Sequence, residues 1–379
     1  MTEKLYYKDS YIKDFTARVI SLTEAERGFR VVLDRTAFFP EAGGQTSDRG
    51  FIADAEVFDV REEGEEIAHY THTAPEGETV QCRLDFEERL DKMRCHTAEH
   101  IISGIFHKHF GIENTGFHLG HEDVTFDTSK PVTPEMLLFA ERLANEAVMK
   151  NMPITTVFPE PSELPKIEYR SKLDLTENVR LVYIGDVDVC ACCAPHVAYT
   201  GEIGIVKFVD AVTHKGGSRI RMLAGMRAYD YVVALFGECT RISLALSAPK
   251  TAIADELDRL LESRAALEYK LVGMGKAVAV SYAERVEKTD GDLVVALPEL
   301  DTDALRTFVN SAADRVGGTL VALTGTDGAY KYIIHNSSPE LAAIVKKANA
   351  ALGGKGGGRP PMAQGSFSAS LDEIKKYFL

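Results

Sequence analysis

Two pairs of potential metal ligands, far apart in the sequence, are the residues best suited to chemistry. His96 and His100 are four residues apart, and so are Cys192 and His196. Residues at i and i+4 lie on the same face of a helix, so His96 and His100 can hold one ion together. Three imidazoles and one thiolate form a donor set that zinc favours in tetrahedral geometry. The spacing therefore predicts a zinc site with these four residues as its ligands.

Such a site could be structural or catalytic. Four protein ligands are typical of a structural zinc, whereas a catalytic zinc keeps one position open. If one ligand is weak, or if the zinc holds a substrate group, the same ion could promote hydrolysis of an ester. The thiolate assignment is also open, because Cys190 and Cys193 lie next to Cys192 and either could replace it. The remaining histidines of this region are expected at the surface: His107, His109, His118 and His121.

The first histidine pair also fits a second class of metal site. His96-x-x-Glu99-His100 matches the inverted zinc-protease motif, in which Glu99 would be the general base. That class expects a carboxylate as its third ligand, and the chain offers a Cys-x-x-x-His pair instead. We therefore set the protease interpretation aside and expect Glu99, from the helical period, on the solvent side of its helix.

A glycine-rich segment over residues 38–50 is a candidate for contact with a ligand. It reads Phe-Phe-Pro-Glu-Ala-Gly-Gly-Gln-Thr-Ser-Asp-Arg-Gly. The adjacent Gly43 and Gly44 let the backbone turn tightly or come close to another molecule. The segment is therefore either a plain turn or a loop that faces a substrate.

A second glycine-rich segment covers residues 353–365 and carries Lys355, Arg359 and Gln364. It is not a Walker A loop, because no Gly-Lys-Ser/Thr enters a helix. Interpreted as a loop rather than a flexible linker, it has backbone amides that could cradle an anion, most plausibly a phosphate.

The pattern along the chain predicts a multidomain protein of the α+β or α/β class. Residues 1–89 form an N-terminal, β-barrel-like domain with the first glycine-rich segment, and residues 90–244 an α+β domain with both ligand pairs. Residues 245–287 form a helical linker and residues 288–379 a small α/β domain. Strands of the first domain are expected at 11–22, 29–33, 50–60 and 67–72.

Two helices of the first half have recognisable boundaries. One should begin between residues 85 and 91 and close at Gly111, and it carries the first histidine pair. The other should start with Thr133 as its cap and Pro134 as its first residue, and run to about Lys150. The second ligand pair should lie on a loop between strands.

The helical linker carries an apolar seam with alternating spacings of four and three residues, which is a heptad pattern interrupted by one arginine. This pattern fits a short coiled coil or one arm of a helical hairpin, and it equally fits an amphipathic helix packed on its own chain. The seam consists of Ile253, Leu257, Leu260, Arg264, Leu267, Leu271 and Met274.

The formal net charge of −14 argues against a protein coated in nucleic acid, because non-specific binding relies on Lys and Arg meeting phosphates. Local basic patches remain compatible with this charge. One lies around Arg219 and Arg221, and residues 319–379 carry seven Lys or Arg against four Asp or Glu.

The cysteine content and the hydropathy point to a reducing compartment. Six cysteines in 379 residues are not a disulfide scaffold, and three of them crowd within residues 190–193. No apolar run approaches 18 residues, and the N-terminus lacks a signal-peptide pattern. We expect a cytoplasmic protein without a membrane span.

Taken together, these motifs resemble those of the freestanding long-form alanyl-tRNA editing proteins (the AlaX family) and of the editing and C-terminal regions of alanyl-tRNA synthetase. Residues 39–50 resemble the family's glycine-rich loop, and the two ligand pairs match its His-x-x-x-His and Cys-x-x-x-His motifs. Residues 219–228 resemble the stretch that follows, and residues 353–365 resemble the glycine-rich signature of the DHH-associated domain. Two positions depart from the pattern, Cys193 after the motif's Cys and Ser366 at the end of the signature.

The resemblance implies a trans-editing hydrolase that deacylates mischarged tRNA(Ala), chiefly Ser-tRNA(Ala), with Gly-tRNA(Ala) as a further candidate. An alanine pocket cannot fully reject serine or glycine, so a second site is needed. Zn2+ would position and polarise the aminoacyl end, which makes Gln45 and Cys192 the catalytic candidates. Thr46 and Thr36 are candidates for contacting the serine hydroxyl. The expected substrate-binding residues are Gly43, Gly44, Gln45 and Thr46.

The same resemblance implies contacts with tRNA and with a second copy of the chain. The expected tRNA-binding residues are Arg219, Arg221, Lys355 and Arg359. A homodimer would form through the C-terminal helical region. Aminoacylation is not expected, because that domain would precede the glycine-rich loop and only about forty residues do so.

Two other functions remain open from the residues alone. One is a zinc-stapled tRNA-binding module without catalysis. A pure binding module would not need both the ligand quartet and the glycine-rich loop, which argues against this alternative. The other is a zinc hydrolase of a different nucleotide ester, which lacks support because no Asp-His-His triplet or metal-carboxylate cluster is found.

Overall fold

A computed structural model of the protein describes residues 1–120, 124–171 and 178–379. They form two compact units, Met1–Glu238 and Cys239–Leu379. Each unit combines helices with β-sheets, so the chain is a mixed α+β multidomain protein, as its sequence pattern predicted. Within the described residues no single helix is long and apolar enough to cross a bilayer, although the consecutive helical segments 225–246 and 250–284 meet the length and composition criteria together.

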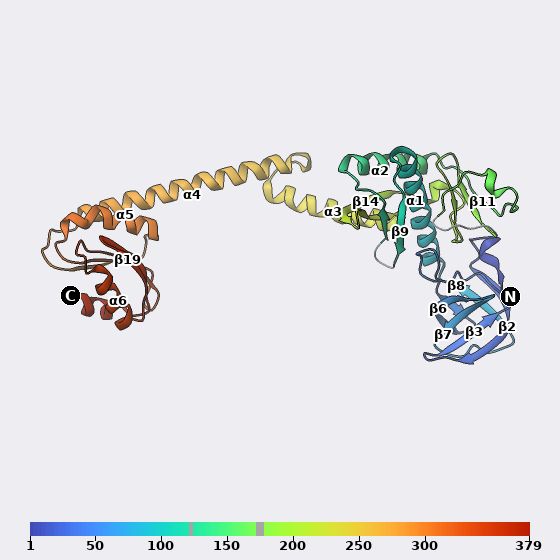
Figure 1. The fold of residues 1–379 in the computed structure, drawn as a ribbon, viewed down its shortest axis with the longest axis horizontal. Coiled ribbons are helices and arrows are strands. Elements are labelled where there is room, and N and C mark those ends of the chain that lie inside the picture. Colours follow the sequence, from blue (N-terminus) through green and yellow to red (C-terminus); the bar gives the residue numbers. More distant parts are fainter. Residues whose placement is uncertain (121–123, 172–177) are drawn as a thin grey trace. The chain divides into compact units, whose positions relative to one another are not determined.

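The first unit begins with a closed β-barrel with strand order β2-β3-β7-β6-β5-β8 (Figure 1). Apolar and polar residues alternate along these strands, so that Phe15, Val31, Val57 and Val80 fill the interior. Closing the sheet pairs its edge strands with each other. The strands are β2 (Asp14–Glu24), β3 (Phe29–Leu33), β5 (Gly50–Ile52), β6 (Ala55–Glu63), β7 (Glu66–Thr71) and β8 (Thr79–Leu84), preceded by β1 (Glu3–Lys4) and η1 (Leu5–Tyr7), with β4 (Arg35–Thr36) paired to β1.

Helix α1 (Phe86–Phe110) follows the barrel and has the predicted ends. The Asp85 side chain accepts a hydrogen bond from Glu88 N, which caps the first turn. Gly111 closes the last turn in the left-handed region at φ 58°, where glycine has no steric penalty. Nearly every residue between Met93 and Phe106 is buried, because protein packs around several sides of this helix.

A second helix and two sheets complete the core of the first unit. Helix α2 (Pro134–Met149) starts at the expected cap, Thr133. The rings of Phe106, Phe126 and Phe208 join α1 to two strands of the four-stranded sheet β14-β15-β10-β9. The other sheet has the order β11-β12-β13. The elements are β9 (Asn114–Leu119), β10 (Val124–Thr128), β11 (Ile154–Val157), η2 (Leu164–Lys166), β12 (Leu181–Ile184), β13 (Asp188–Ala191), η3 (Thr200–Ile203), β14 (Val206–His214), β15 (Gly217–Ala224) and α3 (Gly225–Leu246).

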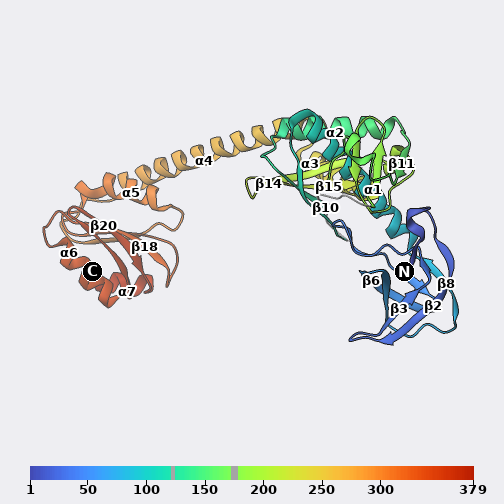
Figure 2. The same cartoon turned by 45° about the vertical axis from the view of Figure 1, so that its right-hand side comes forward.

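The second unit is built on the sheet β16-β17-β18-β20-β19 (Figure 2). Side chains alternate along β17, so Leu320 faces the end of α4 and α5 while Val321 faces α6 and α7. The sheet is therefore covered on both faces. The elements are η4 (Lys250–Ala252), α4 (Ile253–Glu284), β16 (Leu293–Ala296), α5 (Thr302–Ala312), η5 (Ala313–Arg315), β17 (Leu320–Thr324), β18 (Tyr330–His335), α6 (Leu341–Ala351), β19 (Lys355–Arg359), β20 (Met362–Phe367) and α7 (Leu371–Phe378).

The expectation of an anion-cradling loop at residues 353–365 is wrong, because these residues form the hairpin β19–β20. Its glycines serve close strand approach instead: a Cβ on Gly358 would lie 2.3 Å from Met362 O, and one on Gly365 would lie 2.1 Å from Lys355 O. Some of the backbone amides that a loop would offer to an anion instead form hydrogen bonds between β19 and β20.

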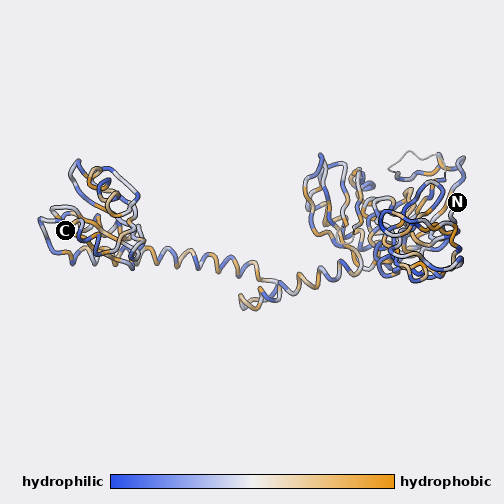
Figure 3. Tube along the Cα trace, turned by 90° about the horizontal axis from the view of Figure 1, so that it is seen from below, coloured by the Kyte–Doolittle hydropathy of each residue, from blue (hydrophilic) through white to orange (hydrophobic). Residues whose placement is uncertain are grey.

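The heptad seam lies on α4 and is exposed. Its leucines Leu257, Leu260, Leu267 and Leu271 are between 46% and 69% exposed, and only the end of the helix, at Ala279 and Ala283, is buried against α5. Along α4, apolar and polar residues alternate (Figure 3). Packing of the seam on its own chain is therefore not observed in the described part of the chain.

A buried ion pair joins α1 to the first glycine-rich segment. Arg89 and Asp48, both buried, form a charge-assisted hydrogen-bonded pair. Arg89 also donates to Ser10 O, and Asp48 accepts from Phe39 N. Next to it, the buried Lys92 ammonium donates to Ser47 O at 2.7 Å. These contacts fix the segment against the helix that carries His96.

The substitution Asp48→Asn should destabilise the first unit by about 3 kcal/mol, because it leaves the Arg89 charge buried and uncompensated. Urea denaturation of the full chain, followed by circular dichroism, measures this change. The control is Glu146→Gln, which removes the exposed pair of Arg142 and Glu146 and should have little effect. Equal effects of the two substitutions would contradict the role given to the buried pair.

Candidate metal centre

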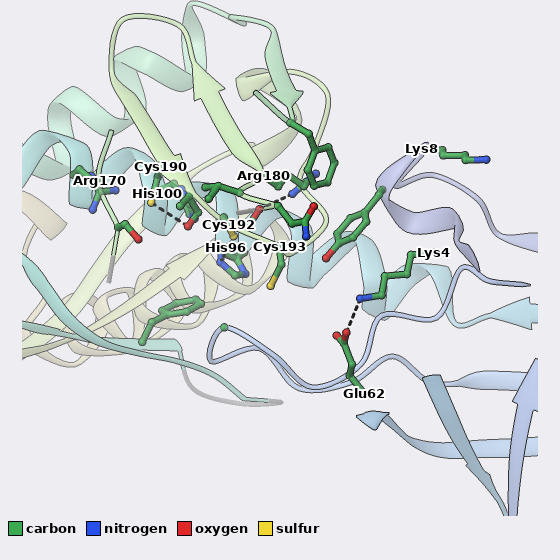
Figure 4. Close-up of a pocket in the computed structure, with 18 of the residues that line it drawn as sticks. Lys4, Lys8, Glu62, His96, His100, Arg170, Arg180, Cys190, Cys192 and Cys193 are labelled. Atoms are coloured by element: carbon green, nitrogen blue, oxygen red, sulfur yellow. Dashed lines mark hydrogen bonds and ion pairs between the residues drawn. The ribbon is translucent and has the colours of Figure 1, made fainter. Parts of the chain in front are cut away.

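The four predicted ligands converge on one point, and Figure 4 shows His96, His100 and Cys192 among them. Helix α1 supplies His96 and His100, and the segment after β13 supplies Cys192 and His196. Their donor atoms all lie within 4.8 Å of one another. The Cys192 Sγ atom is 3.6 Å from His96 Nε2 and 3.5 Å from His196 Nε2. In a tetrahedral site with bonds of about 2.0–2.3 Å, such edges measure about 3.5 Å, so the geometry fits a four-coordinate ion.

Of the three neighbouring thiols, Cys192 is the one that belongs to this quartet. Cys190 lies instead with His100 and Asp188 in a separate group of donors. Cys193 packs against Tyr6 and Tyr7, and burial raises the pKa of its thiol to about 11, so it stays protonated. The structure thus favours Cys192 as the thiolate ligand.

Each histidine ring is held at its Nδ1 atom by a different partner, which leaves the other nitrogen free to point inward. His96 Nδ1 lies 2.9 Å from Gln45 Oε1, and an amide oxygen can only accept. His196 Nδ1 lies 3.0 Å from Thr97 Oγ1, whose proton is already donated to Met93 O. Both rings therefore carry their proton on Nδ1 and present Nε2 as a ligand.

The third ring faces a carboxylate without a hydrogen bond of good geometry. His100 Nδ1 lies at an ion-pair distance of 3.5 Å from Asp188 Oδ2, and both side chains are buried. Asp188 is itself gripped by both ends of the Arg170 guanidinium, at 2.7 and 2.8 Å. A carboxylate behind a ligating histidine orients the ring and raises its basicity. The quartet therefore has an outer layer of partners.

The charges of the site favour a thiolate. Burial alone would raise the pKa of the Cys192 thiol, but the charges on His96 and His100 outweigh it, so that the pKa lies well below its ordinary value. Burial opposes a charge on His100 too, yet the Cys192 thiolate and the Asp188 carboxylate help to hold its pKa well above the usual value. Burial lowers the pKa of His196 to about 3, which keeps this ring neutral. Thiolate and neutral imidazole are the forms that bind a metal ion.

Three of the four ligands, His96, His100 and Cys192, lie in the wall of a cavity of about 1140 Å³, and His196 is buried behind them. The cavity extends from His96, His100 and Cys192 to the N-terminal segment of the chain. Apolar, aromatic and charged groups share its wall, among them Tyr7, Gly43, Glu99, Phe117, Phe158 and Arg180. A buried donor cluster that opens on a cavity of this size can act on a bound molecule.

The glycine-rich segment forms the tight turn that its sequence indicated. Ala42 and Gln45 exchange backbone hydrogen bonds around Gly43 and Gly44, which both have positive φ. A Cβ on Gly44 would lie 2.2 Å from Phe117 O, so only glycine fits there. Of the four expected substrate-binding residues, Gly43 lines the cavity, Gln45 is fully buried behind His96, and Thr46 is half-buried outside the lining.

Two expectations about individual side chains need comment. The prediction that Glu99 faces solvent is wrong: it is buried, lines the cavity and accepts hydrogen bonds from Ser103 and Asn114. Thr36 is fully buried, and its hydroxyl is engaged by His69 Nε2 at 2.8 Å, away from the cavity lining. The histidines expected at the surface, His107, His109 and His118, are exposed, and His121 lies outside the described residues.

The expected tRNA-binding residues lie at the surface. Arg219 pairs with Asp127 and Arg221 with Asp210, so carboxylates neutralise this patch in part. In the second unit Lys355 and Arg359 are exposed at the two ends of strand β19. Since residues four apart on a strand share one face, both point the same way.

Several residues of the site were not found from the sequence. Asp188 was the most accessible omission, because Asp188, Cys190 and Cys192 alternate and so share a face of an extended segment. Thr97 and Arg180 gave no local signal. Their partners, His196 for Thr97 and the carbonyls of Cys192 and Ala194 for Arg180, come from other parts of the sequence or from backbone atoms.

Two family models match parts of the chain. Residues 179–223 match the model described as the threonyl and alanyl tRNA synthetase second additional domain. Residues 290–378 match the DHHA1 domain. The first match includes Cys192 and His196, and the second includes the β19–β20 hairpin.

Similarity to individual proteins extends along nearly the whole chain. The alanyl-tRNA editing protein AlaX-L of Pyrococcus horikoshii is 28% identical over 99% of this chain and 96% of its own length. The alanyl-tRNA editing protein Aarsd1 of Rattus norvegicus is 28% identical over 95% of this chain and 93% of its length. The alanine–tRNA ligase of Halorubrum lacusprofundi is 30% identical over 96% of this chain but only 42% of its own length. The resemblance to freestanding alanyl-tRNA editing proteins is confirmed.

A match among solved structures is more limited. The C-Ala domain of Aquifex aeolicus alanyl-tRNA synthetase matches 24% of this chain and 92% of that domain, at 20% identity and a TM-score of 0.21.

The substitution Asp188→Asn should weaken metal binding by about 10- to 100-fold, because His100 loses the carboxylate that orients its ring. Competition of the purified protein with a chromophoric chelator for Zn2+ measures this affinity. Asp127→Asn is the matched control, since it breaks a similar bidentate Arg–Asp pair at the surface. Unchanged affinity in Asp188→Asn would show that the carboxylate has no part in the centre.

Proposed function

From the likeness to alanyl-tRNA editing proteins, we propose that this protein is an aminoacyl-tRNA deacylase. Its substrate is tRNA(Ala) that carries the wrong amino acid, chiefly serine and also glycine, and its product is the free tRNA. The observation that carries this proposal is the donor quartet of His96, His100, Cys192 and His196, of which the first three line a large cavity. Such a deacylase would act in the cytoplasm, where its six unpaired cysteines stay reduced.

The metal that suits this donor set is zinc. Three imidazoles and one thiolate at tetrahedral spacing match its preferred nitrogen and sulfur ligands, and binding of the ion would displace the proton of His100. When bound, Zn2+ supplies Lewis-acid polarisation of the ester.

The residues around the quartet keep its donors in place. Gln45 and Thr97 each hold the outer nitrogen of one histidine by a hydrogen bond, and the Asp188 carboxylate faces the outer nitrogen of His100 at 3.5 Å. Gln45 Nε2 is buried and has no acceptor among the described residues. We propose that Gln45 acts on the substrate indirectly, by orienting the His96 ring. We also propose that Gly43, which has no side chain, lets the aminoacyl end come close to the histidines.

Selection of serine over alanine requires a hydrogen-bonding group for the serine hydroxyl. A site built around such a group rejects alanine, because its own polar atoms would be left unpaired. Glu99 and Asn114 line the cavity beside His100 and are our candidates for this contact. Glycine would enter by its small size alone, so its hydrolysis should be slower than that of serine.

Binding of the tRNA body would use cations away from the cavity. Lys355 and Arg359 are exposed on one face of β19 and are proposed to contact the phosphate backbone. Arg219 and Arg221 could join them, because exposed ion pairs such as theirs are weak and a phosphate can displace the carboxylate.

Purified, zinc-loaded protein should deacylate Ser-tRNA(Ala) at least about tenfold faster than Ala-tRNA(Ala). Cys192→Ala should abolish the reaction and the zinc content together, since it removes the thiolate. Release of radiolabelled amino acid and elemental analysis of the protein are the measurements.

Cys193→Ala is the matched control for the neighbouring thiol and should keep both the activity and the zinc. If the zinc-loaded wild type leaves Ser-tRNA(Ala) intact, the proposal fails. The two alternative functions, a tRNA-binding module without catalysis and a hydrolase of a different nucleotide ester, would then be favoured.

We also propose that the protein is a homodimer joined through α4. An exposed apolar seam of three heptads is unusual on a monomer and is the surface that a partner helix covers in a coiled coil.

The double substitution Leu260→Glu and Leu267→Glu should convert the dimer to a monomer, because charges would face each other across the seam. Light scattering coupled to size-exclusion chromatography determines the mass. Tyr269→Glu, at an 84% exposed position outside the seam, should leave the dimer intact. A wild-type monomer at micromolar concentration would contradict the proposal.

A further inference from the structure

Arg180 is a buried cation with unused donors in the wall of the cavity. The residue is only 7% exposed and lines the cavity beside Cys192. Its Nη1 donates to Cys192 O at 2.9 Å and to Ala194 O at 2.8 Å. Its Nε is buried without an acceptor, and no described residue accepts from Nη2. Most of the hydrogen-bonding capacity of the guanidinium is therefore available to a ligand.

Arg180 also differs from the other cations of the cavity, because no described carboxylate pairs with it. Lys4 pairs with Glu62, Lys8 with Glu3, and Arg170 with Asp188. For Arg180 the described residues provide no carboxylate; the Tyr7 ring lies 5.4 Å from its guanidinium carbon instead. The Cys192 thiolate is the nearest opposite charge, and a bound metal ion would take up that charge, so the guanidinium is suited to an anion that arrives with a bound molecule.

The surroundings of Arg180 suggest what that molecule carries. The rings of Tyr7 and Phe158 line the same cavity with centroids 5.6 Å apart, and Phe158 is 52% exposed. Exposed aromatic faces stack on nucleic-acid bases, and a guanidinium fork binds phosphate oxygens. Figure 4 shows Arg180 close to Cys192, on the side of the cavity that faces the N-terminal segment. The same wall of the cavity, beside the metal centre, thus offers a guanidinium to an anion and aromatic rings to a base.

We propose that Arg180, Tyr7 and Phe158 form the subsite for the terminal nucleotide of the acceptor end, in which the Arg180 guanidinium binds the 5′-phosphate of that nucleotide. This subsite rests on the proposed deacylase function, because the aminoacyl ester joins the terminal ribose and the quartet must reach it. Arg180 then binds the phosphate of the nucleotide, and the aminoacyl ester lies at the metal centre. Arg180 and Cys192 are neighbours at the open end of the β12–β13 hairpin, where Cys192 N donates to Arg180 O, so the two parts of the substrate would be held side by side.

Adenosine and adenosine 5′-monophosphate (AMP) are the probes that isolate the phosphate contact. Zinc-loaded wild type should bind AMP about 10- to 100-fold more tightly than adenosine by calorimetry, the range expected for hydrogen bonds to a charged group. Arg180→Gln should abolish that difference, and Arg180→Lys should retain part of it. With Ser-tRNA(Ala) as substrate, Arg180→Gln should raise KM more than it lowers kcat.

Arg170→Gln is the matched control, because it removes the other arginine of the cavity wall, a half-buried residue that acts on His100 through Asp188. It should lower activity and keep the preference for AMP. Equal binding of AMP and adenosine by wild type, or an undiminished preference in Arg180→Gln, would overturn the subsite. Because the binding assay requires no turnover, a wild type that prefers AMP but spares Ser-tRNA(Ala) would sink the proposed function and keep the nucleotide subsite.

Discussion

The metal centre depends on keeping three imidazole rings turned inward in a buried space. A histidine side chain has two nitrogens and a ring that can flip, so four residues with the right spacing do not by themselves make a site. Here an amide, a hydroxyl and a carboxylate occupy the outer nitrogens of His96, His196 and His100. Each partner comes from a different segment, and the fold must deliver all three together.

Helix α1 is the element that gathers these segments. Arg89, Lys92, His96 and His100 follow one another along it at helical spacing, and all four are buried. The first two grip the glycine-rich segment, and the last two enter the quartet. The same face of one helix therefore positions both the loop that carries Gln45 and the ligands that Gln45 supports.

Features determined by local chemistry were predictable from the sequence. The ends of α1 and α2 follow from Asp85, Gly111 and Thr133, and the ligand quartet follows from its spacing. Features that depend on distant partners were not predictable. The period of α1 placed Glu99 toward solvent, but the helix is covered on several sides. The glycines of residues 353–365 indicated a loop, although pairing with a neighbouring strand made them a hairpin.

The split origin of the ligands links metal loading to folding. His100 and Cys192 belong to segments that are far apart in the chain, and in the unfolded protein nothing keeps them together. An ion that bridges them acts as a cross-link, and its binding free energy adds to the stability of the first unit. The apo chain must hold the rings in place with its own hydrogen bonds alone. Metal supply in the cell would thus set how much of the first unit resists proteolysis.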